Sequence, residues 1–201
     1  MKIAYLIATH SDARQLKRMI DALEIKGVTD FYVHVDKKVK IEPFIEALES
    51  NHNNCQFTKK RIFTQWGGFS QCRYQEALIN ECIRSGKRYD RVFFLSGLDY
   101  PLWSNKRIIS ELEKNPEKEY ICGMSVTTCD KPSKIKKKVT LYHFFRDIAI
   151  RNGKIKRILS GSSRIITSLL PIRKKPYIKD GARKLEVFQG SSWWCLTWGT
   201  A

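Results

Sequence analysis

The chain has 201 residues, a length that suits one ordinary domain or one domain with an appendage. Hydrophobic residues make up 42% of it, enough for a packed core, so the composition excludes a globally disordered chain. No run approaches the ~20 consecutive apolar residues of a membrane-spanning helix. The apolar start from Ile3 to Ala8 is interpreted as a buried strand, because no small-residue cleavage site of a signal peptide follows it.

The net charge of +17 is concentrated in one stretch of the chain. Between Lys131 and Lys184 seventeen lysines and arginines stand against two acids, so this stretch carries +15 of the total. The sequence therefore predicts three regions: an α/β half at 1–128, a basic and partly helical insert at 129–184, and a further ordered segment at 185–201.

The six cysteines lie scattered along the chain and form no C-x-x-C pair, which argues against a zinc site. Several of them lie in apolar stretches, where a reduced cysteine acts as a small core residue. We infer a reducing compartment and expect a cytoplasmic location.

The first half alternates between strand and helix periodicity. Buried strands are expected at Ile3 to Ala8, Phe31 to Val35, Arg61 to Gln65, Arg91 to Ser96 and Glu119 to Met124. Helix start signals lie between them at Ser11 or Asp12, Pro43, Ser70 and Ser104, and Gly27 and Gly86 are expected to end two of the helices. This alternation predicts an α/β fold with a mostly parallel, Rossmann-like sheet that carries helices on both faces.

The second half is less regular. From Cys129 to about Arg183, clusters of lysine and arginine alternate with single phenylalanines, isoleucines and leucines, and parts of this stretch are compatible with an amphipathic helix. Leu185 to Thr197, with a Gly-Ser turn and paired tryptophans, is expected to return to the ordered core.

Polar residues are expected where the parallel strands end. Ligands of such sheets bind beyond the carboxyl ends of the strands, where Thr9-His10, Asp36, Gln65-Trp66 and Asp99 all fall. The first strand is followed by no glycine, which argues against a dinucleotide fingerprint or a P-loop, and Gly67-Gly68 is better explained as a turn. No D-x-D sequence occurs, so no two-carboxylate magnesium clamp is visible.

Each of these residues also has a purely structural interpretation. Asp36 can accept hydrogen bonds from a ribose or a base N–H, or simply close a turn, and Asp99 before Tyr-Pro is a common turn device. Trp66 can stack on a flat ring or pack at the rim. His10 and His34 are more readily explained by packing than by catalysis.

Five segments, in this order and spacing, resemble the core-2/I-branching β-1,6-N-acetylglucosaminyltransferase family in its bacterial form, a family shared with peptide xylosyltransferases. They are IAYLIATHSD, YVHVDKK, TQWGGFSQ, FFLSGLDYPLWSN and FQGSSWWCLT. The resemblance runs from Lys2 to about Thr197, and the LDYP segment and the HVD strand end are its most specific parts.

The resemblance implies a GT-A-like fold that holds a UDP-sugar on the strand-end rim and inverts the anomeric carbon without a metal ion or other cofactor. Carried over by position, the substrate-binding residues would be Ala8, Thr9, Asp36 and Trp66 around the uridine, Asp99 near the sugar, and Gly190, Ser191 and Trp193 in the acceptor wall. Residues 1–128 would then bind the donor, N-acetylglucosamine or xylose as its UDP-sugar, and 185–201 would begin an acceptor-side subdomain.

The family's catalytic glutamate lies in a D-E motif beyond the paired tryptophans, and this chain ends at Ala201 without one. We therefore assign no catalytic residue, and we expect a truncated chain that holds part of a UDP-sugar site without turning over. A metal-free transferase must supply positive charge to the leaving diphosphate from lysine or arginine.

The expected partners are a UDP-sugar, a glycan acceptor of surface polysaccharide synthesis and, through residues 131–184, an anionic lipid surface on the inner face of the membrane. The alternative is a basic nucleic-acid-binding α/β module. Against it, the charge is confined to one segment and no nucleic-acid-binding motif occurs, so no nucleic acid is expected. A different nucleotide-binding α/β protein would show phosphate loops, which are absent from the sequence.

Overall fold

The computed structural model describes residues 1–49, 53–126, 140–145, 147–148, 150, 152–170, 174–175 and 177–201. The chain divides into two compact units. The first, here called the sheet unit, contains Met1–Thr64, Ser70–Ile121 and Ser192–Ala201. The second, here called the basic unit, contains Gln65–Phe69 and Cys122–Ser191.

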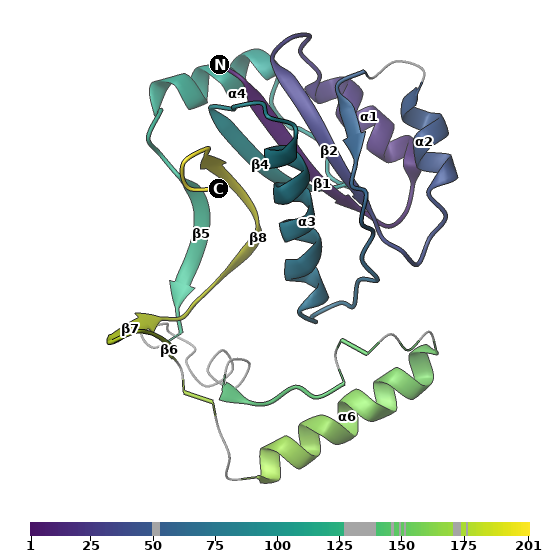
Figure 1. Cartoon of the computed structure of the whole chain (residues 1–201), viewed down its shortest axis with the longest axis vertical. Coiled ribbons are helices and arrows are strands. Elements are labelled where there is room, and N and C mark those ends of the chain that lie inside the picture. The colour runs from purple at the N-terminus through teal and green to yellow at the C-terminus, as the bar shows by residue number, and fades with distance from the viewer. Residues whose placement is uncertain are drawn as a thin grey trace. The chain divides into compact units, whose positions relative to one another are not determined.

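A six-stranded sheet has the strand order β3-β2-β1-β4-β8-β5 (Figure 1). Strands β1, β2, β3 and β4 pair in parallel, and β8 pairs antiparallel with β4. The six strands are β1 (Ile3–Thr9), β2 (Thr29–Val35), β3 (Cys55–Phe57), β4 (Arg91–Ser96), β5 (Tyr120–Ser125) and β8 (Phe188–Thr197). In the basic unit, β6 (Tyr177–Asp180) and β7 (Arg183–Glu186) form a separate antiparallel pair.

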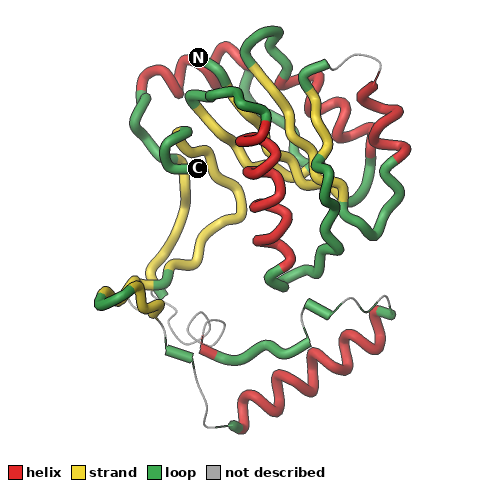
Figure 2. The backbone as a smooth tube through the Cα atoms, viewed as in Figure 1, coloured by secondary structure: helices red, strands yellow, loops and turns green. Residues whose placement is uncertain are grey.

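Helices lie on both faces of the sheet, which confirms the predicted α/β, GT-A-like class (Figures 1 and 2). Helix α3 covers one face, and α1, α2 and α4 lie on the other. Two helices begin at predicted caps: the Asp12 carboxylate accepts a bond from the Gln15 N–H at 2.9 Å, and the Ser104 hydroxyl accepts one from the Arg107 N–H. The helices are α1 (Ala13–Leu23), α2 (Glu42–Glu49), α3 (Ser70–Arg84), α4 (Asn105–Lys114) and, in the basic unit, α6 (Gly153–Leu169).

The central strands are apolar at consecutive positions because both faces are packed. Ile3, Tyr5 and Ile7 of β1 join a core with α1, α2 and α4, whereas Ala4 and Leu6 join a second core under α3. Side chains alternate between the faces along a strand, so a strand covered on both faces must be apolar throughout. The sheet is thereby rigid, and its strand ends are fixed relative to one another.

Three local predictions are wrong. Arg61 to Gln65 is not a strand, because its N–H groups bind side chains instead of a neighbouring strand: Ile62 N donates to the imidazole of His34, and Thr64 N to Asp36. Helix α1 ends at Leu23, before Gly27, which adopts a φ of 75° in the turn into β2. Gly190 and Ser191 lie inside β8 rather than in a turn.

The basic unit contains the predicted amphipathic helix as α6. Much of the lysine-rich part of the predicted insert, residues 127–139, lies outside the described residues. Among the helices that the structure does describe, none combines the length and the apolar character that crossing a bilayer requires.

Candidate functional site

The carboxyl ends of β1, β2 and β4 meet at one rim of the sheet unit. Thr9 is level with Val35 of β2, and Ala8 is level with Ser96 of β4. The first residues beyond β2 and β4 still bond to β1. Asp36 N donates to the Thr9 carbonyl and Gly97 N to the Ala8 carbonyl, both at 2.9 Å. Three of the predicted residues, Ala8, Thr9 and Asp36, are therefore held at this rim by backbone hydrogen bonds.

Asp36 is the buried carboxylate of this rim, with 4% of its surface exposed. Its Oδ1 accepts hydrogen bonds from Lys38 N at 2.9 Å and Thr64 N at 3.3 Å, so this oxygen closes the turn after β2. Its Oδ2 lies 3.4 Å from the ammonium of Lys38, a side chain that is 43% exposed. One oxygen thus closes the turn, and the other faces the ammonium of a long, flexible side chain.

Arg61 and His34 brace the same turn, and sequence reasoning did not single out Arg61. The guanidinium donates to the carbonyls of Val35 at 3.0 Å, Asp36 at 2.8 Å and Val39. Burial lowers the pKa of His34 to about 4; the Asp36 carboxylate opposes this shift and the Arg61 charge adds to it. His34 is therefore neutral near pH 7 and accepts the Ile62 N–H on Nε2 at 2.9 Å, as the packing interpretation predicts.

Asp99 joins the end of β4 to β8. Its Oδ2 accepts a hydrogen bond from Ser96 N at 2.8 Å and another from the indole N–H of Trp193 at 2.5 Å. Its own N–H donates to the Ser96 carbonyl, and its carbonyl accepts from the Gln15 amide. The carboxylate therefore orders the turn into Pro101 and fixes the indole of Trp193, which is 51% exposed.

Gly97 allows the exits of β1 and β4 to approach closely. A Cβ at this position would lie 2.5 Å from both Cβ and Oγ1 of Thr9, closer than any real contact. Gly190 has a similar role within the basic unit, where a Cβ would lie 2.0 Å from the carbonyl oxygen of Cys122. Close packing, against the Thr9 side chain for Gly97 and against the Cys122 backbone for Gly190, accounts for both glycines.

The remaining predicted residues of the site are described within the basic unit alone. Trp66 is 87% exposed, and Gly190 and Ser191 are also exposed. The structure therefore brings Ala8 and Thr9 at the end of β1 together with Asp36 after β2. It also brings Asp99, after β4, together with Trp193 of β8. The ligand roles of all eight residues stay predictions.

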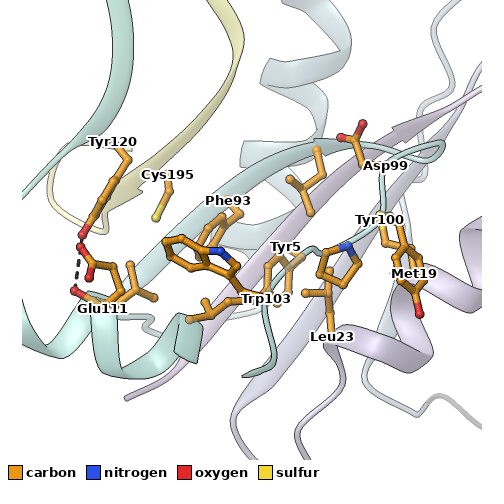
Figure 3. A pocket seen from close by; sticks show the side chains of 14 residues that line it. Tyr5, Met19, Leu23, Phe93, Asp99, Tyr100, Trp103, Glu111, Tyr120 and Cys195 are labelled. Atoms are coloured by element: carbon orange, nitrogen blue, oxygen red, sulfur yellow. Dashed lines mark hydrogen bonds between the residues drawn. The ribbon is translucent and has the colours of Figure 1, made fainter. Parts of the chain in front are cut away.

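The turn that carries Asp99 lines one side of a half-open apolar pocket of about 270 Å³ (Figure 3). Its walls come from β1, α1, β4, α4, β5 and β8, among them Tyr5, Met19 and Phe93. Trp103 and Tyr100 line it from the turn, and Asp99 and Glu111 are also among the lining residues.

Titratable groups elsewhere suggest no second reactive centre in the described part of the chain. Burial raises the pKa of the Cys82 and Cys195 thiols to about 12, so both stay protonated. His10 is exposed. Among the described residues no three histidine, cysteine, aspartate or glutamate side chains cluster as a metal would require.

A mostly parallel six-stranded sheet of this order, with helices on both faces and a buried carboxylate at one rim, is consistent with a GT-A-like glycosyltransferase fold. The profile of the family described as "Branch: Core-2/I-Branching enzyme" matches residues 3–201. The chain therefore belongs to the Core-2/I-Branching enzyme family.

Three curated relatives illustrate the similarity. Xylosyltransferase 2 of Rattus norvegicus and of Homo sapiens are each 32% identical to this chain over 124 residues, which is 60% of this chain. Xylosyltransferase oxt of Drosophila melanogaster is 28% identical over 125 residues, or 61% of this chain. Each match covers 14% of the relative's own length, so the chain corresponds to a small part of these proteins.

Proposed function

We propose that the chain forms the donor-binding part of a glycosyltransferase that takes a UDP-sugar, inverts its anomeric carbon and needs no metal ion. The observation that carries the proposal is the rim itself, where Thr9 and Asp36 lie side by side at the strand ends of a sheet from this family. Such rims bind ligands in α/β proteins because all carboxyl ends of the parallel strands open there. Similarity to xylosyltransferases supports xylose as the donor sugar, with N-acetylglucosamine as the other candidate.

Asp36 is proposed to recognise uracil. The N3–H of uracil is a donor, whereas N3 of cytosine is an acceptor, so a fixed carboxylate favours uracil and repels cytosine. Oδ1 already receives two backbone N–H groups, which leaves Oδ2 as the oxygen for the base. The Lys38 ammonium that covers Oδ2 would then turn away, toward the diphosphate of the ligand.

The transfer itself needs a base for the acceptor hydroxyl and positive charge beside the leaving diphosphate. We assign the base to no residue of the chain. Lys37 and Lys38 follow Asp36 directly and are two candidates for this positive charge. Asp99 and Trp193 are proposed to line the sugar and acceptor side, with the indole held by the bond to Asp99 Oδ2.

The proposed acceptor is a glycan of surface polysaccharide synthesis, reached from the cytoplasmic side of a membrane. The charge distribution supports this setting, since 131–184 carries +15 and an anionic surface would hold it. Ala8, Thr9 and Trp66 are proposed to complete the uridine pocket, and Gly190 and Ser191 the acceptor wall.

Binding of UDP and of CDP, measured by isothermal titration calorimetry on the full chain, tests the proposal. UDP should bind more tightly than CDP, and Asp36→Asn should weaken UDP binding by about tenfold because a charge-assisted hydrogen bond is lost. It should also reduce the preference for UDP over CDP. Asp21→Asn is the matched control, since Asp21 lies on α1 in a surface ion pair with Lys17.

Equal affinity of the wild-type chain for the two nucleotides would contradict the assignment of Asp36 to the base. An Asp36→Asn variant that keeps its circular dichroism spectrum, its affinity and its selectivity would contradict it as well. Unchanged far-UV circular dichroism also separates loss of binding from loss of the turn that Oδ1 closes.

A further inference from the structure

Helix α6 of the basic unit exposes most of its apolar residues and buries two of its small polar ones. Ile158 and Leu169 are 70% and 79% exposed, whereas Ser163 and Thr167 are each 2% exposed. The hydroxyl of Ser163 is buried with no hydrogen-bond partner in the described part of the chain. A helix of a water-soluble protein turns its apolar stripe toward the core, so α6 has the opposite orientation.

The exposed apolar side chains of α6 form one stripe. Ile155, Ile158, Ile166 and Leu169 are all at least 49% exposed, and Ile165 lies beside them. At 100° per residue these positions fall within an arc of about 100°, the width of a helix face that buries against an apolar phase. An apolar face of this kind, interrupted within its arc by Ser162, marks an interaction surface rather than scattered surface residues.

Charge identifies the partner of this stripe. The 17 residues of α6 contain four lysines and arginines and no acid. Lys154 and Arg157 are exposed; Lys154 lies next to the stripe on the helical wheel, and Arg157 lies farther round, on the polar side. A glycan or a nucleic acid would satisfy the cations but offers no apolar phase for isoleucine and leucine. An anionic bilayer supplies both an acyl layer and negative headgroups.

We propose that α6 lies in the headgroup interface of an anionic membrane, with the stripe around Ile158 and Leu169 inserted and the exposed cations Lys154 and Arg157 on the headgroups. The inference deepens the proposed function, on which it rests for its biological meaning: it names the membrane-contacting element within the basic segment. Long cationic side chains at the edge of such a stripe reach back to the headgroups while their stems stay apolar. The chain would thus stay at the surface where a membrane-bound glycan acceptor is made.

Co-sedimentation of the full chain with lipid vesicles tests the proposal. The chain should pellet with vesicles of equal parts phosphatidylcholine and phosphatidylglycerol, and bind pure phosphatidylcholine far more weakly. Ile158→Asp and, separately, Leu169→Asp should each reduce binding to the mixed vesicles by about tenfold or more, because a carboxylate then faces both the acyl layer and the anionic headgroups. The matched control is Ile83→Asp on α3, a residue that is 56% exposed in the sheet unit, and it should bind like the wild type.

Vesicle binding that both aspartate variants retain would overturn the proposal, since charge alone would then explain it. Failure of the wild-type chain to pellet would overturn it too, as would a loss of self-association in the Ile158→Asp variant without loss of vesicle binding. UDP titration of the same samples separates the two proposals. Vesicle binding without UDP binding would contradict the donor site alone, and UDP binding without vesicle binding would contradict only the membrane role of α6.

Discussion

Helices α1 and α6 share one sequence pattern and place it in opposite surroundings. In α1, Leu16, Met19 and Ile20 recur at helical spacing and are completely buried against the sheet. In α6, isoleucines recur at similar spacing and are largely exposed. Apolar periodicity therefore predicts a helix in both regions, but it does not identify what covers the apolar face.

The difference between the two helices follows from the segments that flank each of them in the sequence. Helix α1 lies between two continuous apolar strands, which offer it a surface to cover. Helix α6 lies in a segment of lysines, arginines and isolated apolar residues, where the described structure contains no strand with a continuous apolar face. The proposed partner of the apolar stripe is an anionic membrane, in accord with the charge of that segment.

The most direct test of this difference in burial is the same substitution, isoleucine to alanine, in each helix. Ile20→Ala should destabilise the chain by about 2–5 kcal/mol, because it leaves a cavity in a packed core. Ile158→Ala should change stability by less than about 0.5 kcal/mol, because that side chain is 70% exposed. Urea unfolding followed by far-UV circular dichroism measures both effects. Equal losses would show that α6 is packed as tightly as α1.

The two described histidines at strand ends offer a second contrast, in the pH dependence of stability. Burial lowers the pKa of His34 from 6.5 to about 4, so the unfolded chain binds a proton on His34 at a higher pH than the folded chain does. The contribution of His34 to the free energy of unfolding should therefore be fully present above pH 6.5. It should fall by about 3 kcal/mol as the pH drops from 6.5 to about 4.

His34→Gln should flatten this part of the profile, and its amide oxygen can still accept the Ile62 N–H. His10→Gln is the matched control, because His10 is exposed and the variant should keep the wild-type slope. Urea midpoints collected across the same pH window give the measurement. An unchanged slope in His34→Gln would assign the acid lability to other groups.

The sequence predicts most of the sheet unit because its elements are dictated locally. Continuous apolar runs become buried strands, and Asp12 and Ser104 begin helices where their side chains accept the first free N–H groups. The short β3 at Cys55–Phe57 escapes prediction because three residues carry no recognisable period. Arg61 to Gln65 resembles a strand by composition, and only its side-chain partners show that it is not one.

The candidate site could be predicted where topology alone places it. Parallel strands bring Thr9 and Asp36 to the same rim, so their adjacency follows from the strand pattern. The bond between Trp193 and Asp99 joins residues 94 positions apart, and no local pattern encodes it. The role of Arg61 could not be predicted, because its guanidinium binds backbone carbonyls and these acceptors exist at every position of any sequence.

Two glycines sharpen the contrast between the rigid rim and α6. Gly97→Ala would place a Cβ 2.5 Å from Thr9, so it should destabilise the sheet unit by about 1–3 kcal/mol and weaken UDP binding through the displaced β1 exit. Gly161→Ala in α6 meets no atom within 4 Å and should stabilise the helix by up to about 1 kcal/mol. Urea unfolding and UDP titration of both variants measure these effects.

If Gly97→Ala left both stability and UDP affinity intact, the close approach of β1 and β4 would not be what shapes the rim. A loss of stability in Gly161→Ala would show instead that the helix is packed on that side.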